Sequence, residues 1–191
     1  MEIKYLGGKT VFLKGKKESV LVNPDIEIGN NKNGARIVLY TSESQGRADL
    51  EDNRVLINGA GEYEVGGVEI NGISGGDENT VYRLIVDGFK VVVVEALKQE
   101  LGDKSIERIE ESDVLVVYPE NGTLLSYKMS KDLAKKWGAN YLIPISTDSE
   151  VLNKFLDEAD NEGLEATDFL KIEKAEDLPD GLEIKLLKVT K

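Results

Sequence analysis

The sequence predicts an α/β protein of the α+β type, and two observations lead to this prediction. The first half of the chain contains many short apolar runs separated by Gly-rich turns, which is typical of antiparallel strands. After about residue 100 the apolar period changes, and helical patterns alternate with buried strands. With 191 residues and 40% apolar composition the chain can bury a substantial core, and we expect one domain over 1–191.

Short strands are predicted throughout the first half. The hairpin signal Asp87-Gly88 joins the last two of them, and Val91–Val94 is apolar on both faces, which places that strand inside a layered structure. The predicted strands are Glu2–Leu6, Thr10–Lys14, Ser19–Val22, Arg36–Tyr40, Arg54–Ile57, Gly67–Ile73, Thr80–Asp87 and Phe89–Val94.

Three helices are predicted in the second half. Asp103 can cap a short first helix, and Ser130 can cap a second that stops at Gly138. The third runs from Asp148 to about Asp160 with an apolar stripe on one face. The strands between and after them are Asp113–Tyr118, Asn140–Pro144, Asp168–Ile172 and Leu182–Val189.

The charge balance bears on the kind of partner. The chain has 24 Lys and Arg against 36 Asp and Glu, a net charge of −12, and this field repels nucleic-acid phosphates and anionic membrane surfaces. We therefore expect neither as a partner. The start of the chain lacks a secretory apolar region and no apolar run is long enough to span a membrane, which predicts a cytoplasmic protein.

Two residue types are missing from the sequence. Without Cys there is no disulfide, no zinc–thiolate site and no thiol nucleophile. Without His there is no imidazole ligand for zinc and no Ser-His-Asp triad. These absences exclude most hydrolase chemistry.

Two glycine-containing segments resemble nucleotide-binding loops but lack the required context. Gly8-Lys9-Thr10 has Ile3 where a phosphate-binding loop needs its first Gly, and a strand rather than a helix follows. Gly59-Ala60-Gly61 also continues into a turn and a strand. We reject both as phosphate sites.

Acidic residues offer two further candidates. The loop Gly75–Asn79 carries Asp77 and Glu78 and could bind Mg²⁺ or Ca²⁺, although its spacing favours a solvated turn. Glu95 ends an apolar strand, where a partly buried carboxylate needs a partner that is either structural or catalytic.

The order of segments resembles the small single-domain branch of the metallo-β-lactamase superfamily, akin to the ascorbate-6-phosphate lactonases and related Zn-dependent hydrolases. The resemblance covers nearly the whole chain, and the turn Asn58–Val65, which matches the family's G-P-G-E-Y-E pattern, is its most distinctive part. It implies a four-layer αββα sandwich, with two mixed sheets face to face and helices outside. The other matching segments are Leu6–Gly15, Val20–Pro24, Asp87–Lys90, Asp113–Val117, Leu142–Pro144 and Leu178–Leu187.

Every position at which the family binds metal departs from its pattern. The resemblance aligns the H-x-H-x-D-H loop with Ser42–Arg47, the T-D-P aspartate with Asn23, and the bridging aspartate with Ala96, which follows Glu95. Neutral hydroxyls are weak zinc ligands and a guanidinium repels a cation. The remnant cleft then consists of Gly8, Ser42, Glu43, Ser44, Gly46, Arg47, Asp77, Glu95, Ala96 and Ser146.

Three functions fit this pattern. In the first, which we favour, the chain is a pseudoenzyme without catalytic residues, metal or other cofactor that binds a small ligand or a protein. In the second it is a residual hydrolase in which Glu43, Asp77, Glu78 or Glu95 holds Mg²⁺ or Mn²⁺. In the third it is an inert subunit of an oligomer. We also expect Arg47 to border the former metal cavity and to pair with Glu43, Glu95 or Asp77.

Overall fold

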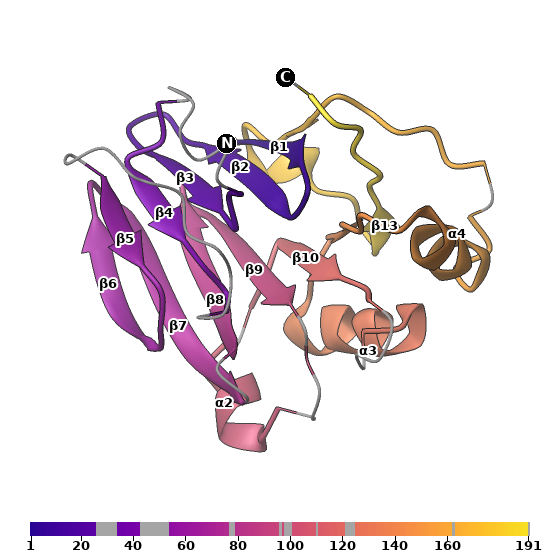
Figure 1. Ribbon diagram of the computed structural model, residues 1–191, viewed down its shortest axis with the longest axis horizontal. Helices are drawn as coiled ribbons and strands as arrows, with labels where there is room; N and C mark the ends of the chain where they lie inside the picture. Colours follow the sequence, from indigo (N-terminus) through magenta and orange to yellow (C-terminus); the bar gives the residue numbers. More distant parts are fainter. Residues whose placement is uncertain are drawn as a thin grey trace.

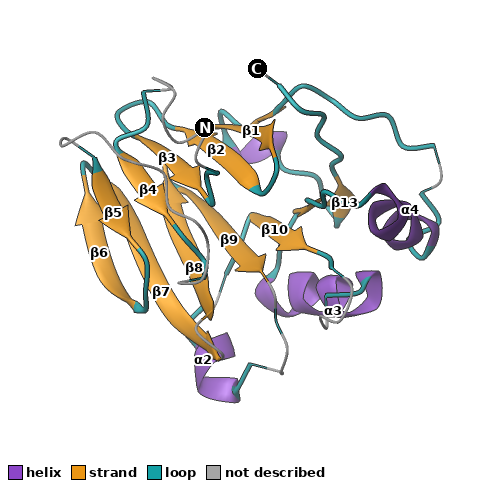
Figure 2. Ribbon diagram, viewed as in Figure 1, coloured by secondary structure: helices purple, strands orange, loops and turns teal. Residues whose placement is uncertain are grey.

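Two mixed β-sheets face each other across a shared apolar core, and helices lie against the outer face of one of them (Figure 1). Figure 2 shows the same arrangement by secondary structure. The computed structural model describes residues 1–25, 34–42, 54–76, 79–95, 97, 101–109, 111–120, 125–161 and 163–190. The paired mixed sheets confirm the predicted sandwich.

The first sheet has the strand order β12-β1-β2-β3-β4-β5. The pairs β3–β4 and β4–β5 are parallel, whereas the pairs from β12 to β3 are antiparallel. Val, Ile and Leu dominate its strands, as expected for residues that face another layer. Its strands are β1 (Glu2–Gly7), β2 (Thr10–Lys14), β3 (Ser19–Val22), β4 (Ile37–Leu39), β5 (Val55–Ile57) and β12 (Leu170–Lys171).

The second sheet has the order β13-β11-β10-β9-β8-β7-β6. The strands from β9 to β13 pair in parallel and those from β9 to β6 in antiparallel fashion. Its strands are β6 (Gly61–Val65), β7 (Val68–Gly76), β8 (Asn79–Val86), β9 (Phe89–Glu95), β10 (Val114–Tyr118), β11 (Tyr141–Pro144) and β13 (Glu183–Ile184).

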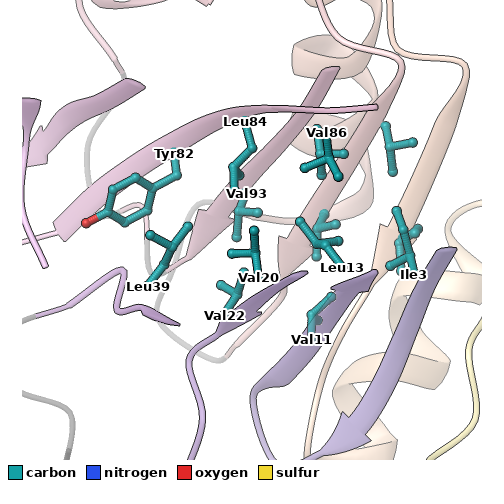
Figure 3. Packing of buried hydrophobic residues seen from close by; sticks show 14 of the residues in the cluster. Ile3, Val11, Leu13, Val20, Val22, Leu39, Tyr82, Leu84, Val86 and Val93 are labelled. Atoms are coloured by element: carbon teal, nitrogen blue, oxygen red, sulfur yellow. The ribbon is translucent and has the colours of Figure 1, made fainter. Parts of the chain in front are cut away.

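The main core fills the space between the two sheets. In Figure 3, Leu13 and Val20 of the first sheet point toward Leu84 and Val93 of the second. All four side chains have no exposed surface. Because alternate residues of a strand face opposite sides, Val92 and Val94 point the other way, into a second apolar cluster beneath the helices.

The helices cover the outer face of the seven-stranded sheet. Each helix contributes a side chain to the apolar contacts on that face. Trp137 and Phe155 belong to the apolar cluster there, and Ile106 packs against it. The helices are α2 (Asp103–Glu107), α3 (Tyr127–Trp137) and α4 (Ser149–Asp157), and a 3₁₀ turn η1 spans Ala175–Asp177.

The helix starts correct two of our predictions. The N-cap of α3 is Ser126, whose hydroxyl accepts a hydrogen bond from the Met129 amide, and Ser130 is instead buried inside the helix. Gly102 rather than Asp103 caps α2. Asp148 does cap α4, and Gly138 ends α3 in the left-handed conformation with φ of 70°, as predicted.

The turns agree with the sequence predictions more closely than the helix starts do. Asp87 and Gly88 have φ of 54° and 86°, the conformation of a tight two-residue hairpin, and they connect β8 to β9. Gly61 begins strand β6, so Gly59-Ala60-Gly61 does not precede a helix. The predicted strand Leu182–Val189 is much shorter in the structure, where β13 spans Glu183–Ile184.

Strand β6 ends the order of the seven-stranded sheet in the part of the chain described. Its Glu62 and Glu64 side chains are exposed, whereas Gly61, Tyr63 and Val65 are half-buried.

None of the described helices is both long enough and apolar enough to cross a membrane.

Candidate functional site

The candidate site is built around one buried carboxylate, that of Glu95. This residue ends β9 and is 3% exposed. The strand before it, Val91–Val94, is fully buried and carries the carboxylate into the interior at the carboxyl end of the sheet. A buried carboxylate is stable only when hydrogen bonds and an opposite charge compensate for lost water. The neighbouring strand ends supply both.

Lys9 provides the opposite charge. Its Nζ lies 2.6 Å from Glu95 Oε1 and 2.6 Å from Glu120 Oε1, so one ammonium is shared by two carboxylates. The side chains of Lys9 and Glu120 are 35% and 36% exposed, whereas that of Glu95 is 2% exposed. The ion pair therefore extends from the interior to the surface at the mouth of the site.

Asn23 and Thr41 satisfy the other carboxylate oxygen. The Asn23 amide donates to Glu95 Oε2 over 2.7 Å, and the Thr41 hydroxyl donates to the same oxygen. Asn23 Oδ1 in turn accepts a hydrogen bond from the Thr41 backbone amide over 2.9 Å. Both side chains are buried, so this polar network lies inside an apolar fold.

The fold brings these residues together because strands of both sheets end close to one another, at one end of the sandwich. Asn23 follows β3, Thr41 lies just after β4, and Glu95 closes β9. Asn23 has φ of 50°, a left-handed conformation that Asn tolerates better than most residues, and this turn aims its amide at Glu95. Lys9 enters from the turn between β1 and β2.

Tyr118 fixes the backbone of the lysine. Its hydroxyl donates a hydrogen bond to the Lys9 carbonyl oxygen over 2.9 Å, and the residue is only 1% exposed. Burial, and then the nearby negative charge of Glu95, raise the pKa of Tyr118 well above the ordinary value. The phenol therefore stays neutral and acts here as a hydrogen-bond donor.

The protonation state of Lys9 limits its chemistry. Burial lowers its pKa, but hydrogen bonds and charge from Glu120 and Glu95 outweigh that effect, and the pKa is raised above 10.5. A protonated amine has no lone pair, so at neutral pH Lys9 is neither a nucleophile nor a general base. It can donate hydrogen bonds and balance charge.

The donors around Glu95 do not suit a metal ion. A metal needs ligand lone pairs, whereas the ammonium of Lys9 and the amide nitrogen of Asn23 present hydrogens to the carboxylate. Within the described ranges no group of three or more Asp or Glu side chains could hold a cation, and the sequence has no His or Cys. The zinc implied by the resemblance does not fit these residues.

Four of the ten predicted site residues lie within the described ranges. Glu95 is the centre of the site, and Gly8 precedes Lys9 in the β1–β2 turn. Ser42 follows Thr41 and forms an isolated bridge with Asn79. Ser146 lies two residues after the end of β11, and its hydroxyl accepts a hydrogen bond from the Asp148 backbone amide. Glu43, Ser44, Gly46, Arg47, Asp77 and Ala96 lie outside the described residues.

Four residues of this network are not predicted by the sequence patterns: Lys9, Thr41, Tyr118 and Glu120. Lys9 stood in the rejected motif Gly8-Lys9-Thr10, and the structure confirms that strand β2 rather than a helix follows it. A signal was present: a lysine beside a glycine turn and a carboxylate ending an apolar strand are complementary charges. What the sequence does not reveal is that the two segments, 86 positions apart, meet.

Comparisons with known proteins agree with this architecture. The family model described as "Beta-lactamase superfamily domain" matches residues 2–146. A protein from Thermotoga maritima, assigned as a Zn-dependent hydrolase of the metallo-β-lactamase superfamily, is 22% identical with a TM-score of 0.76, and 98% of each chain is covered. A search of curated proteins finds no match.

Two further solved structures are similar at lower identity. The metallo-β-lactamase fold protein YhfI from Bacillus subtilis has a TM-score of 0.65 at 11% identity, with 98% of this chain and 97% of that one covered. A protein from Parabacteroides distasonis, assigned as a metal-dependent hydrolase, has a TM-score of 0.63 at 12% identity, with 97% and 93% covered. At these identities the likeness concerns the fold.

Proposed function

We propose that this chain, which belongs to the metallo-β-lactamase superfamily, is a pseudoenzyme that binds a small ligand or a protein partner without metal. The observation that carries the proposal is the set of contacts on Glu95. Both of its carboxylate oxygens are engaged by hydrogens of Lys9, Asn23 and Thr41. These donors stabilise the negative charge of Glu95 and occupy the oxygens that would otherwise hold a metal ion or activate a water molecule.

A polar ligand is the occupant that the mouth of the site favours. Lys9 and Glu120 are each about one-third exposed and present a donor and an acceptor to solvent. Behind them the network of Asn23, Thr41 and Glu95 is buried. Recognition would therefore use the exposed pair, with the buried residues holding it in place.

The test combines metal analysis with assays of activity and binding. Purified protein, dialysed against a weak chelator, should retain no stoichiometric zinc and should not hydrolyse phosphodiesters, lactones or β-lactams at neutral pH. One equivalent of retained zinc would overturn the proposal. Hydrolysis that requires added Mn²⁺ or Mg²⁺ would favour the residual hydrolase instead.

Ligand binding is tested separately by thermal shift. A scan over Zn²⁺, Mn²⁺, Mg²⁺ and phosphorylated sugars measures the melting temperature, which rises with the logarithm of ligand excess when the native state binds. A rise with a phosphorylated sugar that is lost in Lys9→Met would support the exposed pair as the recognition element. A rise confined to Zn²⁺ would contradict the proposal.

A further inference from the structure

The starting observation is the position of the buried charge. Glu95 directly precedes Ala96, at which the resemblance to the metallo-β-lactamase superfamily places a metal-bridging aspartate. Asn23, which donates to Glu95 over 2.7 Å, aligns with another ligand of that family. The carboxylate thus lies where a relative would use a cation, and it remains in a chain whose residues do not suit a metal.

We infer that the Lys9 ammonium is the built-in cation of this site and performs the charge compensation that a metal ion performs in metal-dependent relatives. Its Nζ contacts two carboxylates at 2.6 Å each, and one of them is almost fully buried. Its backbone carbonyl is held by the Tyr118 hydroxyl. The inference rests on the metal-free part of the proposed function and not on the identity of any ligand.

A tethered cation can be distinguished from an ordinary surface ion pair. Exposed pairs contribute little to stability, whereas removal of one partner from a buried pair leaves an uncompensated charge. Glu95 is buried, so loss of the ammonium should be costly even though Lys9 itself is partly exposed. Neutralising Glu95 at the same time should relieve that cost.

The first experiment is a set of thermal unfolding measurements. Lys9→Met, which keeps the apolar stem without the charge, should lower the melting temperature by about 5–10 °C. Lys14→Met, at the exposed end of β2, the strand that follows Lys9, is the matched control and should change it by no more than about 2 °C. The double variant Lys9→Met with Glu95→Gln should recover at least half of the loss.

Two results would overturn the inference. One is equal melting temperatures for Lys9→Met and Lys14→Met. The other is a double variant no more stable than Lys9→Met, because the lysine would then act through its stem and not its charge. If Lys9→Met does not accumulate as folded protein, the double variant decides: its folding supports the inference and its failure to fold contradicts it.

The second experiment supplies the missing cation from solution. Lys9→Ala removes a propylammonium-sized group, so added propylammonium should raise the melting temperature of this variant in a concentration-dependent way. Tetramethylammonium carries the charge but no N–H donor and should have a smaller effect. Wild type and the double variant Lys9→Ala with Glu95→Gln should not respond to propylammonium.

The controls also separate this inference from the proposed function. An equal response of wild type and Lys9→Ala, or no response of Lys9→Ala, would overturn the built-in cation. Retained zinc in the wild type would overturn the proposed function even if Lys9→Met were unstable. The two ideas are therefore contradicted by different measurements.

Discussion

The Tyr118 hydroxyl donates a hydrogen bond to the backbone carbonyl of Lys9 over 2.9 Å, which joins residues 109 positions apart. This contact ties the β1–β2 turn of one sheet to strand β10 of the other. It also determines how far the lysine side chain can reach toward Glu95. The position of the ammonium therefore depends on packing between the sheets.

Tyr118→Phe should destabilise the protein by about 1–2 kcal/mol, because the partly buried Lys9 carbonyl loses its donor while the ring is kept. Urea unfolding measures the change. Tyr63→Phe is a suitable control, since the Tyr63 hydroxyl is 3.3 Å from the Gly59 carbonyl and its ring is half-buried, and it should cost less. Equal losses in both variants would contradict a special role for the Tyr118 contact.

Stability should fall at alkaline pH. Lys9 has a raised pKa in the folded protein, so its contribution is complete below the unfolded value of 10.5 and is lost as the pH rises through the folded value. Two tyrosines act in the same direction, because burial raises the pKa of Tyr82 to about 12 and raises the pKa of Tyr118 well above its ordinary value. Among the described residues, the carboxylates that pair with Lys9 are those of Glu95 and Glu120.

Comparing variants isolates the lysine from the tyrosines. Urea midpoints measured between about pH 8 and pH 12 should decline less steeply for Lys9→Met than for wild type, and the gap between the two should narrow above pH 10.5. Lys14→Met should follow the wild-type curve. Parallel curves for wild type and Lys9→Met would count against this assignment.

Asn23→Asp should cost about 2–4 kcal/mol at neutral pH, because a donor 2.7 Å from Glu95 becomes a second carboxylate. The left-handed backbone at this position tolerates Asp, so the substitution should add little backbone strain to the measured loss of stability. Urea unfolding at neutral pH checks this.

Asn140→Asp is the matched control for that substitution. The Asn140 amide donates to the Pro179 carbonyl over 2.7 Å, so the variant also loses a donor but creates no contact with Glu95. Its cost should be smaller than that of Asn23→Asp. If both variants lose the same stability, charge repulsion at the site is not the cause.

A chelator should leave the melting temperature unchanged, because the core and the Glu95 network are complete without a divalent ion. Differential scanning calorimetry with and without EDTA measures this. A decrease of several degrees would reveal a cation site, and Asp77→Asn together with Glu78→Gln would then test whether it lies in the loop singled out in the sequence.

Much of the fold could be predicted because local patterns determine it. The strands Thr10–Lys14 and Ser19–Val22 have the expected bounds, since glycine and polar turns delimit short apolar runs on both sides. The sequence predicts the start of α3 one turn too late, at Ser130 instead of Ser126. Ser126 and Ser130 are both plausible caps by sequence, and only the packing of Ser130 inside the helix distinguishes them.

The site was predicted less completely, for a physical reason. The need of Glu95 for a partner follows from burial, which the apolar run before it indicates. The identity of that partner depends on which strand ends share an edge, and this is a property of the sheet topology. The pairing of Glu95 with Arg47 stays a prediction, because Arg47 lies outside the described residues. In the described part the cation paired with Glu95 is Lys9.

The carboxylates on β6 bear on how copies of this protein behave when crowded. A strand at the end of a sheet leaves backbone groups to which a strand of another molecule could add, and exposed charge discourages such addition. Glu62 and Glu64 occupy this edge on a chain with a net charge of −12. Growth of the sheet from one molecule to the next would bring like charges together, so the resistance to aggregation that they provide should weaken as added salt screens them.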